Sequence, residues 1–166
     1  MMNDYIDVTP LFPLQANLDE EIHRLHHEDY QTTIHKRILA LFVELGEFAN
    51  ETRCFKFWSL KGPSSKEIIL DEYADALHFF LSLGLAIGVK DMKIHIEPRF
   101  ANLVEQLECV YDDVACFSQK IDESSYRKAF GDFLNIIPLL NYNEKDLILA
   151  YKKKLAINYQ RQENHY

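Results

Sequence analysis

The stretch VELGEFANETRCFKFW, which runs from Val43 to Trp58, decides how the rest of the sequence is interpreted. It places three glutamates, Glu44, Glu47 and Glu51, three or four residues apart in an otherwise largely apolar segment. On an α-helix, residues at that spacing lie on one face, so the glutamates form a charged stripe on a helix that should face the core. So much negative charge on one stripe needs a chemical reason.

A second segment repeats the arrangement. Glu72 and Asp75 are also three residues apart, and apolar residues surround them. If the two segments form neighbouring antiparallel helices, then Glu44, Glu47, Glu72 and Asp75 converge on one point. Such a cluster of carboxylates is strongly destabilising unless cations neutralise it.

Hard divalent cations are bound through carboxylate oxygens, and Mg²⁺ usually keeps waters and completes its shell with substrate phosphates. The two acidic pairs therefore predict a metal site. The alternative is that these acids lie on solvated helix faces and pair with lysine or arginine, as most charged helix residues do. That alternative is preferred for a single pair, whereas two pairs on adjacent apolar helices favour a metal.

Hydrophobic periodicity predicts an all-α protein. The 166 residues contain only five glycines and five prolines, and the segments between them repeat every three to four residues. The segment 54–64 is aromatic and basic and contains Gly-Pro, which is typical of a loop. We expect one helical bundle, a single domain over residues 1–166, because no linker or internal repeat divides the chain.

Capping residues and prolines predict where the helices begin and end. The sequence Asn17–Glu20 resembles a capping box that opens a first short helix, with Asn17 and Asp19 as structural caps. Pro98 fits the first turn of the fourth helix, and Pro138 stops the fifth. The predicted helices after the first cover about 30–53, 64–88, 98–120, 123–137 and 143 to near the C-terminus.

Composition narrows the possible partners and locations. Lys and Arg number 18 against 26 Asp and Glu, and the net charge of −8 disfavours a nucleic-acid partner. The longest apolar run, 76–89, is too short to span a bilayer and predicts a buried helix. The first residues lack the features of a signal peptide, so we expect a cytoplasmic protein.

The three cysteines lack the spacing of metal ligands, and we expect Cys109 and Cys116 at core positions.

Four motifs, in order, resemble one group of enzymes. The two acidic pairs resemble the all-α nucleoside triphosphate pyrophosphatases, the superfamily of MazG-type enzymes and dimeric dUTPases. Within this superfamily, two motifs are similar to the dimeric dUTPases. They are ELGEFANETRCFKFW, from Glu44 to Trp58, and DEYADALHFF, which contains His78. The sequence LQANLD at 14–19 and the tail at 151–166 are similar to the opening motif and the phosphate-binding tail of that branch. Residues 90–140 match no motif, and His165 stands where a glycine is common.

The resemblance implies hydrolysis of dUTP to dUMP and pyrophosphate, by attack of water on the α-phosphorus, with dUDP as a further substrate. Glu44, Glu47, Glu72 and Asp75 would hold two or more Mg²⁺ ions, with Mn²⁺ as a second candidate ion. Glu47 would also orient and deprotonate the attacking water. A homodimer is implied because sites of this family form beside a subunit interface.

The resemblance also implies residues that bind the phosphates of the substrate. These are Lys154, Arg161, Tyr166 and, more weakly, Lys56. Lys154, Asn158 and Arg161 fall on one stripe of the last helix, which makes the tail coherent on physical grounds. The alternative for these cations is a solvated basic helix.

For the nucleobase, the resemblance offers Gln15, Trp58, His78, Phe79 and Asn158. Such a site needs hydrogen bonds to the uracil edge and a wall that leaves no room for a 5-methyl or amino group. Without the resemblance, Trp58 and Phe79 would be assigned to packing. His78 would be as well explained as a buried histidine with satisfied hydrogen bonds.

Three other functions are open at this point. One is a house-cleaning pyrophosphatase on the same scaffold with a different base specificity. Another is a non-catalytic homologue that binds a partner protein, although such a protein would be expected to lose an acid or a tail cation. The third is a di-iron bundle, which needs Glu-x-x-His on two helices. The chain offers only Asp75-x-x-His78, once.

Overall fold

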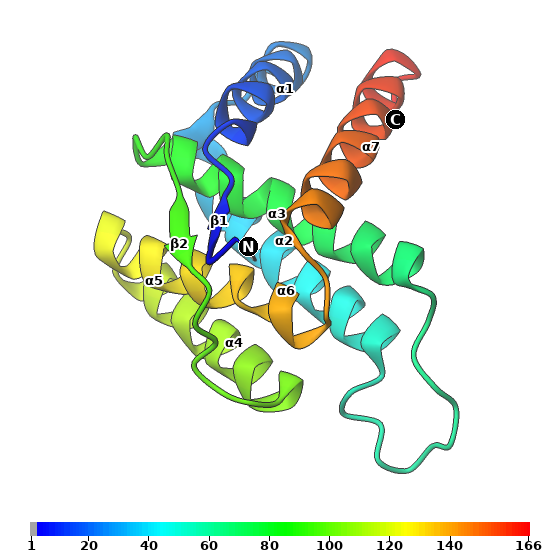
Figure 1. The fold of residues 1–166 in the computed structure, drawn as a ribbon. Coiled ribbons are helices and arrows are strands. Elements are labelled where there is room, and N and C mark those ends of the chain that lie inside the picture. Colours follow the sequence, from blue (N-terminus) through cyan, green and yellow to red (C-terminus); the bar gives the residue numbers. More distant parts are fainter. Residues whose placement is uncertain (1–2) are drawn as a thin grey trace.

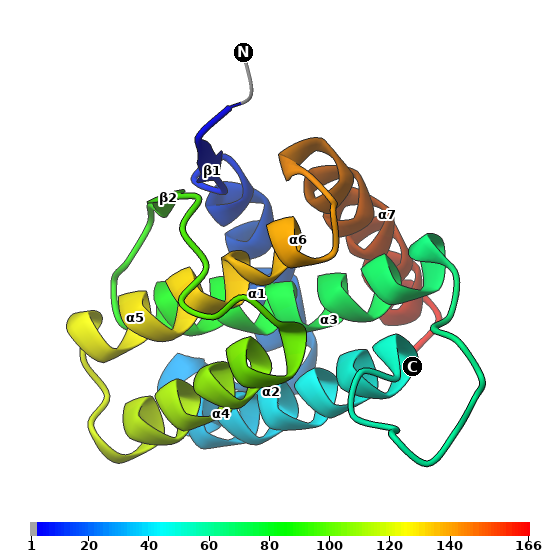
Figure 2. The ribbon, with the colours of Figure 1, turned by 60° about the horizontal axis from the view of Figure 1, so that its bottom comes forward.

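Two long antiparallel helices, α2 (Tyr30–Thr52) and α3 (Lys66–Ala86), lie at the centre of the computed structural model, which describes residues 3–166 (Figure 1). The other helices are α1 (Leu11–His26), α4 (Leu103–Gln119), α5 (Glu123–Leu134), α6 (Ile136–Leu139) and α7 (Glu144–Glu163). Helices α1 and α7 pack against α3, whereas α4 packs with α5 and α2 (Figure 2). The prediction of an all-α bundle is confirmed.

Helix α2 follows the sequence prediction closely. The Asp29 side chain accepts a hydrogen bond from the Thr32 backbone at 2.8 Å, and the Thr32 hydroxyl accepts one from the Asp29 backbone at 3.1 Å. This reciprocal cap fixes the first turn. The apolar stripe of the helix is buried along its length, and the helix ends before Arg53, whose backbone is left-handed.

Helix α3 is buried on most of its surface, which explains its continuous apolar run. Its aromatic rings stack on α5, with Tyr73 and Phe133 at 4.2 Å and Phe80 and Phe130 at 5.0 Å between ring centroids. The Tyr73 hydroxyl donates to the Phe133 carbonyl at 2.9 Å, so this buried phenol is satisfied. Among the described residues, no helix combines the length and apolar character needed to cross a membrane.

Several predicted boundaries were wrong. Helix α1 begins at Leu11, so Asn17 and Asp19 lie inside the helix and do not cap it. Helix α4 begins after Asn102, whose side chain accepts from the Glu105 backbone, and Pro98 lies before it in an irregular segment. The fifth predicted helix is broken at Asn135, and Pro138 falls within the short helix α6.

Two smaller predictions also need correction. Helix α3 begins at Lys66, two residues later than predicted, with Ser65 as its N-cap, and Ser64 donates to the Glu51 carboxylate. Cys116 is exposed and Cys109 only partly buried, so the prediction of core positions for these two cysteines was wrong.

A pair of short antiparallel strands, β1 (Tyr5–Asp7) and β2 (Lys93–His95), was not predicted. Ile6 lies opposite Ile94, and the pairing ties the N-terminal segment to the chain that follows α3. Each strand has three residues, which is too short to give a detectable alternation in sequence.

The close approach of α3 and α5 depends on Gly84. A Cβ at this position would overlap the Tyr126 hydroxyl and lie 3.0 Å from the Phe12 ring. The Tyr126 hydroxyl cannot easily move, because it is buried and donates to the Phe80 carbonyl at 2.6 Å.

We therefore expect Gly84→Ala to lower the free energy of unfolding by about 1–3 kcal/mol, as overpacking of a core does. Urea denaturation monitored by circular dichroism measures this change. Gly62→Ala is the control, because nothing lies within 4 Å of a Cβ there. Equal stabilities of the two variants would contradict this account of α3 packing.

Candidate functional site

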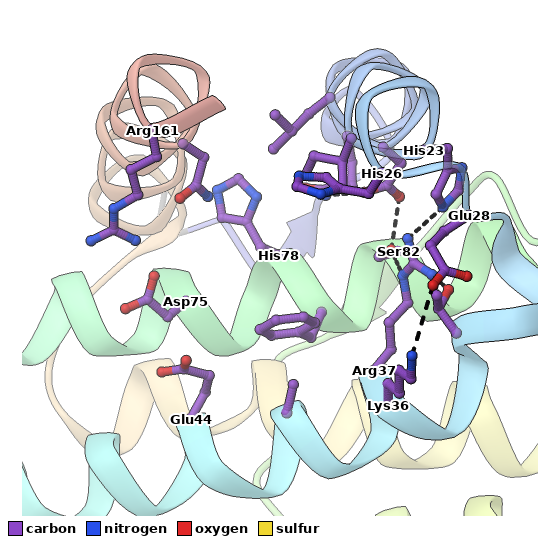
Figure 3. Close-up of a pocket in the computed structure, with 18 residues that line it drawn as sticks. His23, His26, Glu28, Lys36, Arg37, Glu44, Asp75, His78, Ser82 and Arg161 are labelled. Carbon is purple, nitrogen blue, oxygen red and sulfur yellow. Dashed lines mark hydrogen bonds and ion pairs between the residues drawn. The ribbon is translucent and has the colours of Figure 1, made fainter. Parts of the chain in front are cut away.

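Glu44 of α2 and Glu72 and Asp75 of α3 come together where the two central helices face each other. Each offers a carboxylate oxygen that lies within 4.8 Å of the others, and all three side chains are partly buried. Glu44 and Asp75 point toward one another across the gap between the helices (Figure 3). The sequence therefore identified three groups that meet although 28 residues separate Glu44 from Glu72.

Burial, together with the charges of neighbouring acids, raises the pKa values of these three carboxylates. Burial raises the pKa of Glu44 to about 7, helped by the negative charges of Asp75, Glu72 and Glu47. Burial also raises the pKa of Glu72, again with repulsion from Asp75. For Asp75 burial is the largest cause of the upward shift, and Lys154 opposes it. The protein thus holds carboxylates together at a cost in stability, which is typical of a functional site.

Glu47 does not join the other three acids. It lies on the exposed side of α2, next to the cluster, and its charge raises the pKa values of Glu44 and Glu72. Glu51, one turn further on, accepts a hydrogen bond from Ser64 and anchors the loop between α2 and α3. Of the four predicted metal ligands, the structure brings together three and leaves Glu47 beside them.

Lys154 of α7 is a counter-ion of the cluster. It is only 4% exposed, and its ammonium lies 3.0 Å from Asp71 and 3.2 Å from Asp75. Burial alone would lower the pKa of Lys154, but the hydrogen bonds and charges of Asp71 and Asp75 raise it. Asp71 was not among the predicted site residues, although its position four residues before Asp75 places it on the same face of α3.

No basic side chain neutralises Glu44 or Glu72 within the described chain, since neither forms a salt bridge there. The second acidic group of the described residues, at the α4–α5 contact, differs in this respect. Its two carboxylates, Asp113 and Asp132, pair with Lys128 at 3.3 Å and Arg99 at 3.2 Å. The Glu44–Glu72–Asp75 set is therefore the one whose oxygen-only donors fit a hard divalent cation.

A cavity of about 420 Å³ runs from this cluster between the central helices and the pair formed by α1 and α7 (Figure 3). Five of the predicted substrate-binding residues line it, and these are Gln15, His78, Phe79, Asn158 and Arg161. They come from three different helices, so only the tertiary fold brings them to one wall. The cavity is large enough for a nucleoside and lies next to the carboxylates.

His78 projects into the middle of this cavity. It is 5% exposed and stacks on Tyr151, with ring centroids 4.2 Å apart, yet neither ring nitrogen has a hydrogen-bond partner among residues 3–166. Burial lowers the pKa of His78 to about 3, so the ring is neutral at physiological pH. A buried imidazole without partners costs free energy, and a bound ligand would satisfy it. This observation favours the ligand contact over the satisfied core histidine.

Gln15 is held in place from both ends of its amide. Its nitrogen donates to Asp19 at 2.9 Å, and its oxygen accepts from the Tyr151 hydroxyl at 3.0 Å. Asp19 also accepts from Tyr30 at 2.9 Å and from Ser82 at 2.7 Å. Asp19 is therefore a buried acceptor that ties α1 to α2 and α3, which explains why it does not cap a helix.

Besides Lys154, three predicted contacts lie outside the cavity. The loop between α2 and α3 leaves the bundle (Figure 1). Trp58 on this loop is 65% exposed and packs on Phe55 and Phe57. Lys56 lies over the Phe55 ring. At the C-terminus, the Tyr166 ring lies 5.1 Å from the Arg161 guanidinium and is largely exposed.

Sequence reasoning missed Arg37, Ser82 and His23, which line the end of the cavity away from the carboxylates. Arg37 and Ser82 lie in segments whose apolar pattern was assigned to the core. The spacing of these residues could have indicated their place. Arg37 precedes Glu44 by two helical turns and Ser82 follows Asp75 by two, so each lies on the same helix face as the acid.

The carboxylate cluster predicts a gain in stability when Glu44 becomes neutral. The folded protein holds the Glu44 proton up to about pH 7, whereas the unfolded chain releases it near 4.5, so the penalty that Glu44 places on the metal-free fold grows from about pH 4.5 and is complete above about pH 7. We expect Glu44→Gln to raise the free energy of unfolding at pH 8 in EDTA by about 1–2 kcal/mol. The gain shrinks as the pH falls toward 4.5 and Glu44 itself becomes protonated.

Urea denaturation at several pH values measures this effect. Glu108→Gln is the control, because Glu108 is an exposed residue of α4 without a salt bridge in the described chain. A loss of stability in Glu44→Gln at pH 8 would show that Glu44 is stabilised by its surroundings, contrary to the geometry.

A family model described as dUTPase matches residues 7–166. The match includes α1 to α7 and therefore every residue placed in the cavity above. A search of curated proteins finds no match.

Proposed function

The chain belongs to the dUTPase family, and from this premise we propose how its cavity hydrolyses dUTP. The protein is a dUTP diphosphatase whose substrate is a nucleotide, and its family points to a divalent metal cofactor. The observation that carries the proposal is the set of three carboxylates within 4.8 Å at one end of a nucleoside-sized cavity. The reaction proposed is hydrolysis of dUTP, and also of dUDP, with dUMP as the nucleotide product.

Glu44, Glu72 and Asp75 would hold the metal, which we propose to be two or more Mg²⁺ ions, with Mn²⁺ as a substitute. Bound there, the metal would neutralise phosphate charge and lower the pKa of the attacking water. Glu47 lies at the exposed edge of the same cluster, where it can contact water and still approach the phosphate. Its proposed role is to orient this water and accept its proton for attack on the α-phosphorus.

Arg161 and Lys154 of α7 would bind the phosphates. Arg161 lines the cavity near Asp75, and its planar guanidinium can donate to two phosphate oxygens at once (Figure 3). Lys154 already contacts Asp75, so it can exchange part of that contact for a phosphate oxygen without leaving its place. Lys56 and Tyr166 would reach the phosphates only if the loop at 54–64 and the C-terminal residues approach the cavity when the substrate binds.

The base and sugar would occupy the middle of the cavity. Phe79 supplies an apolar wall, while Gln15, His78 and Asn158 supply polar atoms. The two ring nitrogens of neutral His78, one a donor and one an acceptor, match the mixed donors and acceptors of a nucleoside. Trp58 would cover the base after movement of its loop.

The homodimer and the cytoplasmic location remain predictions. Two apolar side chains on the outer face of α2, Leu39 and Val43, are 66% and 53% exposed. They are four residues apart and so adjacent on the helix surface, and they lie close to the carboxylate cluster in sequence. This exposed apolar face supports a subunit contact beside the site.

The nucleotide selectivity of the enzyme tests the proposal. We expect hydrolysis of dUTP in the presence of Mg²⁺, much slower turnover of dTTP, dCTP and dATP, and complete loss of activity in EDTA. Product analysis by chromatography measures all four rates. Comparable rates on all four nucleotides would favour the house-cleaning pyrophosphatase, and activity unaffected by EDTA would contradict the role given to the carboxylates.

The role of Glu47 as the base can be separated from metal binding. We expect Glu47→Gln to lower kcat by about 10²–10⁴-fold, the usual contribution of general base catalysis, with little change in KM. Glu51→Gln is the matched control on the same helix, because the Glu51 side chain is held by Ser64. If both variants lost activity equally, or neither did, Glu47 would not be the base.

A further inference from the structure

We propose that Arg37, supported by Ser82, binds the 4-carbonyl oxygen of uracil and makes the enzyme select uracil over cytosine. The inference rests on the proposed function, because it assumes that the triphosphate lies at the carboxylate end of the cavity. It concerns the opposite end, which no predicted site residue occupies.

The pairing of α2 and α3 places Arg37 at that end. Glu44 faces Asp75 at one end, and the Nε of Arg37 donates to the Ser82 hydroxyl at 2.8 Å at the other (Figure 3). Seven residues separate Arg37 from Glu44, and seven separate Asp75 from Ser82. Seven residues of α-helix rise about 10 Å, which is comparable to the reach of a nucleotide from its α-phosphate to the outer edge of its base.

Arg37 is a buried cation without a carboxylate in contact. It is 8% exposed, and none of the described acidic side chains lies within salt-bridge distance of it. The nearest acid in the hydrogen-bond network is Asp19, which accepts from Ser82 at 2.7 Å and so is one hydroxyl away. The guanidinium lies over the Tyr30 ring, 4.9 Å from its centroid, but this contact does not neutralise its charge. A buried cation that no carboxylate neutralises directly favours an electronegative ligand group.

The guanidinium also has donors to spare. One terminal nitrogen donates to the Thr33 hydroxyl, and the other lies 2.7 Å from His23 Nε2. Burial, followed by the charge of Arg37, lowers the pKa of His23, so the neutral ring accepts this hydrogen bond. Arg37 has five N–H bonds, of which three are used in the described structure, and the Arg37 side chain lines the cavity.

The chemistry of the base fits this end. In a nucleotide whose phosphates lie at Glu44 and Asp75, the 4-position of the pyrimidine is the ring substituent far from the sugar and points toward Arg37. Uracil carries a carbonyl oxygen there, which accepts from the guanidinium. Cytosine carries an amino group, so donors would face donors and the Arg37 N–H bonds would stay unpaired. Sites built in this way reject the wrong group strongly.

Binding of nucleoside monophosphates in EDTA tests the proposal without catalysis or metal. Calorimetry would compare dUMP, dCMP and the analogue of dUMP with 2-pyrimidinone, which lacks the 4-oxygen and the N3 hydrogen. We expect the wild type to bind dUMP about 10- to 100-fold more tightly than either of the others. Arg37→Met, which keeps the apolar stem of the side chain but removes the guanidinium and its donors, should bind all three with similar, weak affinity.

Lys36→Met is the matched control, because Lys36 lines the same end of the cavity but is exposed and paired with Glu28. It should keep the preference for dUMP. Arg37→Lys and Ser82→Ala, checked for folding by thermal denaturation, provide further variants if Arg37→Met is unstable. Both should reduce the ratio of kcat/KM for dUTP over dCTP.

An unchanged preference for dUMP in folded Arg37 variants would overturn the inference, and so would equal losses in Arg37→Met and Lys36→Met. Either result can occur in an enzyme that still hydrolyses dUTP with Mg²⁺. Failure of the proposed function would look different, because the wild type itself would then show no selective hydrolysis of dUTP.

Discussion

Repulsion among Glu44, Glu72 and Asp75 is the constraint on which the rest of the structure depends. Antiparallel packing of α2 and α3 forces these carboxylates together, and burial raises the pKa values of all three. The bundle tolerates this cost because the remainder of α3 is buried against α1, α5 and α7. Apolar burial along the helix offsets a local electrostatic penalty that a surface helix could not sustain.

The same helix pairing gives the cavity its polarity. Acids gather at the Glu44 end, whereas Arg37 and Ser82 lie two turns away at the other. Lys154 and Arg161 enter from α7, so cations and acids meet where a metal-bound triphosphate would need both. Between the two ends lies neutral His78, whose ring nitrogens find no partner in the described part of the chain. A substrate with a charged head and a neutral polar base matches this order.

The sequence predicted those features of the fold that depend on neighbouring residues, which are the helices and the residues that share a helix face. Helical periodicity and the Asn143 cap gave the extents of α2 and α7, and the spacing of the acids placed Glu44, Glu72 and Asp75 on facing helices. The start of α1 was missed because Asp19 looks like a cap, while its real partners, Tyr30 and Ser82, are distant in sequence. Arg37 was missed for the same reason, because its place in the cavity depends on its contact with Ser82, which is distant in sequence. Trp58 lies on an irregular loop, and hydrophobic periodicity predicts helices but gives no information about the conformation of such a loop.

Anomalous diffraction from crystals grown with Mn²⁺ and a non-hydrolysable α,β-imido analogue of dUTP would test the central claim most directly. The account predicts manganese peaks bounded by Glu44, Glu72 and Asp75, in contact with the α-phosphate. Manganese bound only elsewhere, such as at Asp113 and Asp132, or a nucleotide whose phosphates lie away from the three carboxylates, would contradict it.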